Sequence, residues 1–98
     1  MAVDFNYTDE ELSGLACNTI IADLSTIEKI EWCIRYSQKA SHRQSAIVRL
    51  YIAGTTSTGV AGFDIDIPAG TITDMVTEMD ALATRIEYCQ GIIDNNLP

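Results

Sequence analysis

The residues best suited to chemistry in this chain lie between Trp32 and Tyr51, where a protein of net charge −8 concentrates its cations. Residues 32–63 contain no Asp or Glu, but they hold four of the six Lys and Arg residues and the only histidine. On a helix, positions 32, 36, 39 and 43 share one face, so aromatic rings would lie beside cations. Such a surface is typical of proteins that bind nucleotide-like anions. The candidate anion-binding residues are Trp32, Arg35, Tyr36, Lys39, His42 and Arg43.

Structural explanations for the same residues stay open. Cations near residue 40 would suit the negative end of a helix dipole if a helix ends there. The rings of Trp32 and Tyr36 could simply cover the core. A third explanation is an acidic protein surface as partner, because the rest of the chain holds all fourteen acids with only Lys29 and Arg85. That acidic surface could belong to a second copy, so the charge polarity could direct assembly.

Catalytic and metal chemistry are not expected. His42 has no acid nearby in the sequence that would orient its ring as a triad requires. The glycine-bounded stretch G-T-T-S-T-G lacks the lysine of a phosphate-binding loop. The three cysteines, Cys17, Cys33 and Cys89, form no C-x-x-C pair, so they are expected to pack as small apolar side chains rather than bind metal. We therefore predict no enzyme, no metal and no cofactor.

The composition also predicts the compartment and excludes some partners. The acidic start MAVDFNYTDEE lacks the features of a signal peptide, and no apolar run reaches membrane-spanning length. Overall acidity argues against direct binding of nucleic acid. We expect a soluble cytoplasmic protein, in the host cytoplasm or a virion if a phage encodes it.

A single domain is predicted for residues 1–98, opening with a short arm at 1–7. Apolar residues then recur every three or four positions, which predicts a long helix over residues 8–40. Thr8 and Glu11 have the spacing of a capping box at its start.

A second capping box is possible further along this helix. Ser25 and Glu28 have the same spacing, so a new helix could begin there after a bend near Asp23. One helix, with or without a kink, is the preferred prediction.

A β-hairpin is predicted over residues 46–67. Two runs rich in β-branched residues flank the G-T-T-S-T-G loop. In the register that places Val48, Leu50 and Ile52 on one apolar face, Leu50 faces Phe63 and Arg49 faces Asp64.

A closing helix is predicted over residues 71–94, with Thr71 as its N-cap. Its apolar residues alternate steps of three and four, which is the heptad pattern of a coiled coil. One partner helix cannot cover all the apolar residues of these two helices, so a homo-oligomeric helical bundle is expected. The candidate oligomer-interface residues are Met75, Met79, Leu82, Ile86 and Ile93.

The predicted fold class is α+β: two long antiparallel helices joined by a two-stranded antiparallel hairpin. The stretch Ile65–Asp74, I-D-I-P-A-G-T-I-T-D, and the apolar seam from Ile72 to Ile93 resemble small uncharacterised phage proteins with a helix–β-hairpin–helix arrangement. The resemblance covers about a third of the chain and implies no activity. It implies a phage structural or accessory protein.

The expected function is therefore that of a non-catalytic, oligomeric interaction protein that acts through protein–protein contacts. Two alternatives stay open. One is a binding module that sequesters a nucleotide-like anion at the basic and aromatic face, as an anti-defence protein would. The other is an acidic inhibitor that mimics nucleic acid.

Overall fold

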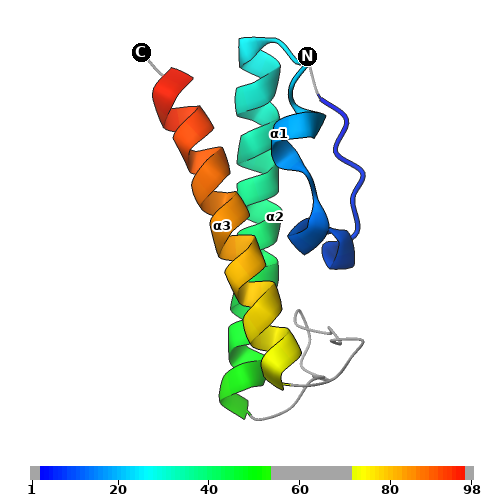
Figure 1. Ribbon diagram of the computed structural model, residues 1–98, viewed down its shortest axis with the longest axis vertical. Coiled ribbons are helices and arrows are strands. Elements are labelled where there is room, and N and C mark those ends of the chain that lie inside the picture. The colour runs from blue at the N-terminus through cyan, green and yellow to red at the C-terminus, as the bar shows by residue number, and fades with distance from the viewer. Residues whose placement is uncertain (1–2, 54–71, 97–98) are drawn as a thin grey trace.

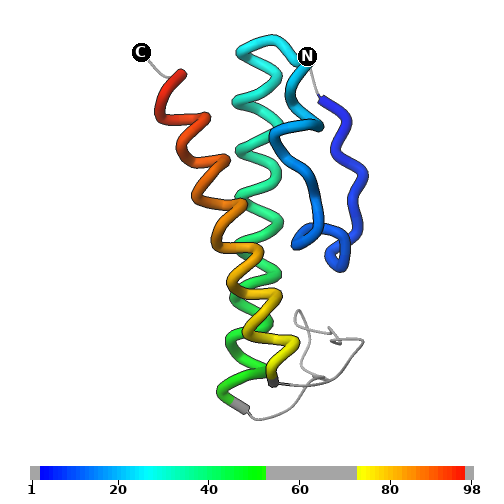
Figure 2. Tube along the Cα trace, in the orientation of Figure 1, coloured from blue at the N-terminus to red at the C-terminus, as the bar shows by residue number. Residues whose placement is uncertain are grey.

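The computed structural model describes residues 3–53 and 72–96, and these residues form a helical hairpin with a short N-terminal segment packed against it (Figure 1). The two long helices, α2 (Thr26–Ala53) and α3 (Ile72–Asn96), run antiparallel. At 1.5 Å per residue they are about 42 Å and 37 Å long. A 3-10 helix, η1 (Asp9–Gly14), and a single turn, α1 (Cys17–Ile20), precede them. This segment folds back beside α2 (Figure 2).

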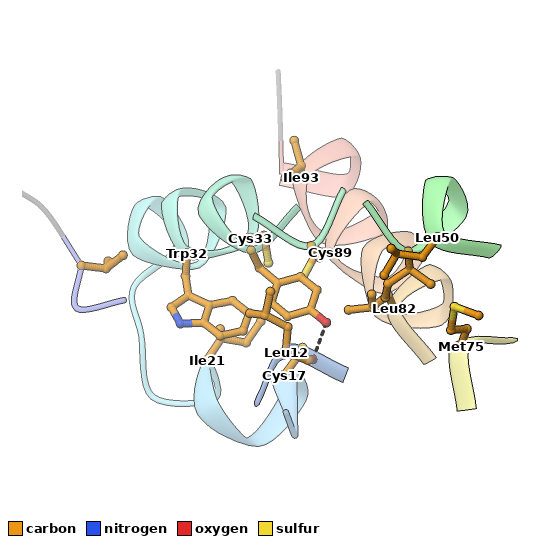
Figure 3. Close-up of a cluster of buried hydrophobic side chains, with 14 residues drawn as sticks. Leu12, Cys17, Ile21, Trp32, Cys33, Leu50, Met75, Leu82, Cys89 and Ile93 are labelled. Atoms are coloured by element: carbon orange, nitrogen blue, oxygen red, sulfur yellow. Dashed lines mark hydrogen bonds between the residues drawn. The ribbon is translucent and has the colours of Figure 1, made fainter. Parts of the chain in front are cut away.

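The core lies between α2, α3 and the N-terminal segment, and both long helices contribute residues at helical spacing. On α3, the stripe expected from the heptad pattern faces inward, and Leu82 and Cys89 are fully buried. Figure 3 shows Leu50 of α2 beside Leu82 and Met75 of α3. Each fully buried large aliphatic side chain of this kind stabilises the fold by about 1.5–3 kcal/mol. The buried positions of α2 are Trp32, Cys33, Tyr36, Ala40, Arg43, Ala46, Ile47 and Leu50.

The predicted β-hairpin, and with it the α+β fold class, is wrong. Its first strand is the last part of α2, which is helical through residue 53, and no strand occurs in residues 3–53 or 72–96. Ile47 and Leu50 are buried at helical spacing, whereas Val48 and Ile52, predicted to share a face with Leu50, are exposed. The β-branched residues gave a local preference for a strand, but burial against a neighbouring helix decides such segments. The predicted second strand and its Asp64 lie outside the described residues.

The single helix predicted over residues 8–40 is also wrong. The chain instead forms η1 and α1, and α2 begins only at Thr26. The break lets the N-terminal segment return to α2, where the Tyr36 hydroxyl donates a hydrogen bond to the Leu12 carbonyl at 2.7 Å. A continuous helix would carry Leu12 away from Tyr36, because 24 residues of helix span about 36 Å.

The alternative start at Ser25 is the one that the structure has. The Ser25 backbone N–H donates to the Glu28 carboxylate at 3.1 Å, and the Glu28 N–H donates to the Ser25 hydroxyl at 3.3 Å. These are the two reciprocal bonds of a capping box, and they satisfy N–H groups that lack partners inside a helix. They lower the pKa of Glu28 below its ordinary value of 4.5.

This cap predicts an acid-dependent contribution to stability. Because the folded pKa of Glu28 is lowered, its contribution is present above pH 4.5 and is lost as the pH falls through the lowered value. We expect Glu28→Gln to be less stable than wild type near neutral pH, and this deficit to be smaller at about pH 3, in urea unfolding followed by circular dichroism. Glu10→Gln, at an exposed glutamate of η1, is the control. An equal deficit for Glu28→Gln at both pH values would contradict the assignment.

Candidate functional site

The predicted anion-binding face points toward the interior of the protein. Trp32, Tyr36 and Arg43 are at most 1% exposed, so a ligand in solvent cannot reach them. Lys39 is half-buried, and only Arg35 and His42 of the six candidates are exposed. The structure therefore does not bring the six residues together on one open surface.

Arg43 explains part of the charge pattern, because its partner is an acid of α3. Its Nε donates to Glu78 Oε2 at 2.6 Å and its Nη2 donates to Glu78 Oε1 at 3.2 Å. Burial by itself would lower the pKa of Arg43, but the hydrogen-bonded carboxylate of Glu78 outweighs burial and raises it. The Arg43 Nη1 is buried without a hydrogen-bond partner among the described residues. Arg43, one of the four cations of the segment without acids, is thus paired with an acid inside its own chain.

The aromatic candidates form the centre of a ring cluster. Trp32 stacks on Tyr36 with centroids 5.5 Å apart and planes 12° apart, and the ring of Phe5 meets Trp32 edge-on at 5.3 Å. Burial raises the pKa of the Tyr36 hydroxyl, which donates to the Leu12 carbonyl. Both faces of the pair are therefore used for packing, and neither is a free platform for a ligand base.

The remaining cations contact groups of their own chain. Lys39 donates a hydrogen bond to the Tyr7 carbonyl and lies 3.9 Å from the Asp9 carboxylate, so it holds the N-terminal segment. Arg35 lies 3.7 Å from Glu31 one turn earlier on α2, in a pair that solvent reaches. Exposed pairs of this kind contribute about 0–1 kcal/mol.

The five predicted oligomer-interface residues lie toward the inside of the hairpin. Met75 and Leu82 are fully buried, and Ile93 is 9% exposed. Met79 and Ile86 are partly buried against the same core. The heptad seam is thus a contact between α3 and the rest of its own chain, so any contact between copies must use other faces.

Two outward faces of the hairpin carry opposite charge. The charge pattern of the sequence predicted that the basic segment could meet an acidic surface of a second copy, but it did not identify the residues of either face. On α2, an uncharged stripe with alternating steps of four and three includes Ile52, which is 79% exposed, and lies beside exposed basic residues seven positions apart. On α3, exposed acids also recur every seven residues. The spacing of seven was the signal available in the sequence. The uncharged stripe is Ile34, Gln38, Ser41, Ser45, Val48 and Ile52; the basic stripe is Arg35, His42 and Arg49; the acidic stripe is Asp80, Glu87 and Asp94.

A groove of about 710 Å³ lies on the same side of α2, lined by Gln44, Ser45, Val48, Arg49 and Ile52. Its lining is mainly uncharged, and two of its residues belong to the exposed apolar part of the uncharged stripe.

The three cysteines are brought together from three elements. Cys17 of α1, Cys33 of α2 and Cys89 of α3 are all buried and all belong to the core (Figure 3). No group of histidine, cysteine and acidic residues in the described part of the chain has the arrangement needed to hold a metal ion. A cleft of about 490 Å³ opens beside Cys17 and Arg85.

No helix within residues 3–53 and 72–96 has both the length and the apolar character needed to cross a membrane. Comparisons with protein-family models, with curated proteins and with solved structures found no match. The resemblance to phage proteins thus stays a prediction, and the function must be argued from the surfaces of this chain.

Proposed function

We propose that this protein is a non-catalytic interaction protein that self-associates, with the outward face of α2 in one copy packed on the outward face of α3 in a second copy. The observation that carries the proposal is the pairing of an exposed basic stripe on one helix with an exposed acidic stripe on the other. Charged residues that flank a helix–helix seam select partner and register.

The two stripes match in length. Arg35 to Arg49 and Asp80 to Asp94 both span fourteen residues, which is about 21 Å of helix. Basic residues on α2 and acidic residues on α3 both recur at steps of seven, so residues of the two stripes can meet repeatedly along one contact between copies. A single chance pair would give neither the repeat nor the equal length.

The surfaces between the charges suit close packing of helices. Ile34, Val48 and Ile52 of α2 are 41%, 39% and 79% exposed, which is apolar area that a second copy would remove from water. Exposed Ala83 and Thr84 on α3 are small, so the backbone of a partner helix could approach closely. A bundle of four helices is the natural result of joining two such hairpins.

The alternative of a bound anion has less support. It needs Trp32, Tyr36 and Arg43 on an open face, and all three are at most 1% exposed. If Arg43 left Glu78 to bind a ligand, the Glu78 carboxylate, which is only 13% exposed, would lose its counter-charge.

Reversing the acidic stripe tests the proposal. We expect wild type to elute as an oligomer in size-exclusion chromatography with light scattering, and the mass to fall toward 10.7 kDa in the variant Asp80→Lys, Glu87→Lys, Asp94→Lys. High salt should weaken the wild-type oligomer, because exposed charges are screened over about 3 Å at 1 M salt.

The matched control reverses three exposed acids elsewhere, Asp4→Lys, Glu10→Lys and Asp23→Lys. Each triple variant changes the net charge by +6, from −8 to −2, so the two variants differ only in the positions of the substitutions. The control should keep the wild-type mass. A monomeric wild type at all concentrations, or an equal loss of mass in both triples, would rule out the proposed contact.

A further inference from the structure

The cysteine cluster has an arrangement that simple core packing does not require. Cys17, Cys33 and Cys89 belong to one buried cluster, and the thiols of Cys17 and Cys89 are close enough to change each other's acidity. Cys17 comes from α1 and Cys89 from α3, so the pair joins segments 72 residues apart in the sequence.

Cys17 lines an opening to solvent. The cleft beside it is formed by the α1 segment and α3, and its walls include Asn18, Thr84, Arg85 and Tyr88. Cys33 and Cys89 are 0% exposed, whereas Cys17 is 4% exposed. A small oxidant therefore meets the Cys17 sulfur first.

Arg85 brings a positive charge to this sulfur. Its Nε donates to the Leu15 carbonyl at 2.8 Å, and the Cys17 thiol donates to the same carbonyl at 3.8 Å, so one oxygen holds both groups. The Arg85 Nη1 also donates to the Ala81 carbonyl at 3.2 Å, which fixes the guanidinium on α3. Thiolates are favoured beside arginine in partly accessible sites of this kind.

The acidities of the three thiols follow their surroundings. The neighbouring Cys89 thiol lowers the pKa of Cys17 below its ordinary value of 9.0, and the charge of Arg85 adds to this against the opposing effect of burial. The neighbouring Cys17 and burial raise the pKa of Cys89, and burial raises the pKa of Cys33. Cys17 is thus the first of the three to ionise, and the thiolate is the form that reacts with peroxides.

We propose that Cys17 is a site of oxidation by hydroperoxides and that Cys89 resolves it, closing a disulfide that ties α1 to α3. The Cys17 thiolate attacks one peroxide oxygen, the O–O bond breaks, and the alkoxide or hydroxide leaves and takes up a proton. Cys89 then attacks the sulfenic sulfur, the S–S bond forms, and the hydroxyl leaves as water with the proton of Cys89. Two thiols supply two electrons, and the hydroperoxide is reduced to an alcohol or to water.

Peptide mapping tests the proposal on the wild-type chain. The reduced protein is treated with limiting hydrogen peroxide, its remaining thiols are alkylated, and tryptic peptides are analysed without reduction. Cleavage after Lys29, Arg35 and Arg85 separates the three cysteines into different peptides. The expected first product is a Cys17–Cys89 disulfide with Cys33 alkylated. A first product that involves Cys33, or no disulfide within the chain, would overturn the proposal.

Variants separate the two steps. Cys89→Ala should stop at a sulfenic acid on Cys17 that dimedone traps, whereas the control Cys33→Ala should still form the disulfide. Arg85→Gln should slow the oxidation of Cys17 by about threefold or more, and Arg85→Lys, which keeps the charge, should retain most of the rate. Equal rates for Arg85→Gln and wild type, or dimedone labelling of Cys33 in Cys89→Ala, would count against it.

Discussion

Replacing Glu78 with alanine will destabilise the fold by about 3–5 kcal/mol, because it leaves the guanidinium of Arg43 buried without its counter-charge. Arg43 is 1% exposed, and two of its guanidinium nitrogens donate hydrogen bonds to Glu78. Its Nη1 already lacks a hydrogen-bond partner among the described residues. Urea unfolding followed by circular dichroism measures the change.

The double variant Arg43→Met, Glu78→Met is the control that separates the pair from its isolated charge. Replacing a buried ion pair by apolar residues of similar volume is often neutral or stabilising, so this variant should be far more stable than Glu78→Ala. Arg43→Met alone should fall between them, because Glu78 is 13% exposed and water can reach it. A loss in the double variant as large as that in Glu78→Ala would show that the ion pair itself stabilises the fold.

Replacing Trp32 with alanine is expected to destabilise the protein by about 3–5 kcal/mol, the usual range for a fully buried tryptophan. Trp32 is 1% exposed and contacts the rings of Phe5, Tyr7 and Tyr36, so the cavity would lie between α2 and the N-terminal segment. The change is measured by chemical unfolding followed by circular dichroism, since the variant has no tryptophan.

Trp32→Phe keeps an aromatic ring and is the matched control. The indole N–H has no hydrogen-bond partner among the described residues. Replacing Trp32 with phenylalanine therefore reduces the buried volume without breaking a hydrogen bond there. We expect its loss to be less than half that of Trp32→Ala. If Trp32→Ala stayed within about 1 kcal/mol of wild type, Trp32 would be a surface residue rather than part of the core.

The long helix α3 shows what the periodicity of apolar residues can and cannot predict. Seven apolar residues with alternating steps of three and four predict one helix with one apolar face, and the structure has α3 at residues 72–96. The pattern could not say what covers that face. Residues chosen as an oligomer interface, such as Met75 and Leu82, are buried within the chain instead.

The end of α2 shows where local patterns fail. Residues 46–53 alternate in a way that suits a strand, yet Ile47 and Leu50 also continue the inward seam of a helix. A short apolar run fits both periods, so the sequence alone does not separate them. Residues 46–53 are helical because Ile47 and Leu50 are buried in the core that α2 shares with α3.

The sequence by itself determined the capping box at Thr8, the apolar stripe of α3 and the separation of positive from negative charge, because each depends only on residues near one another in the chain. It offered the capping box at Ser25 only as the alternative to one continuous helix. Only the tertiary structure decided that residues 46–53 are helical, that Arg43 meets Glu78 inside the protein, and that three cysteines from three elements share one site. These outcomes depend on contacts between segments far apart in sequence, where burial outweighs local preference.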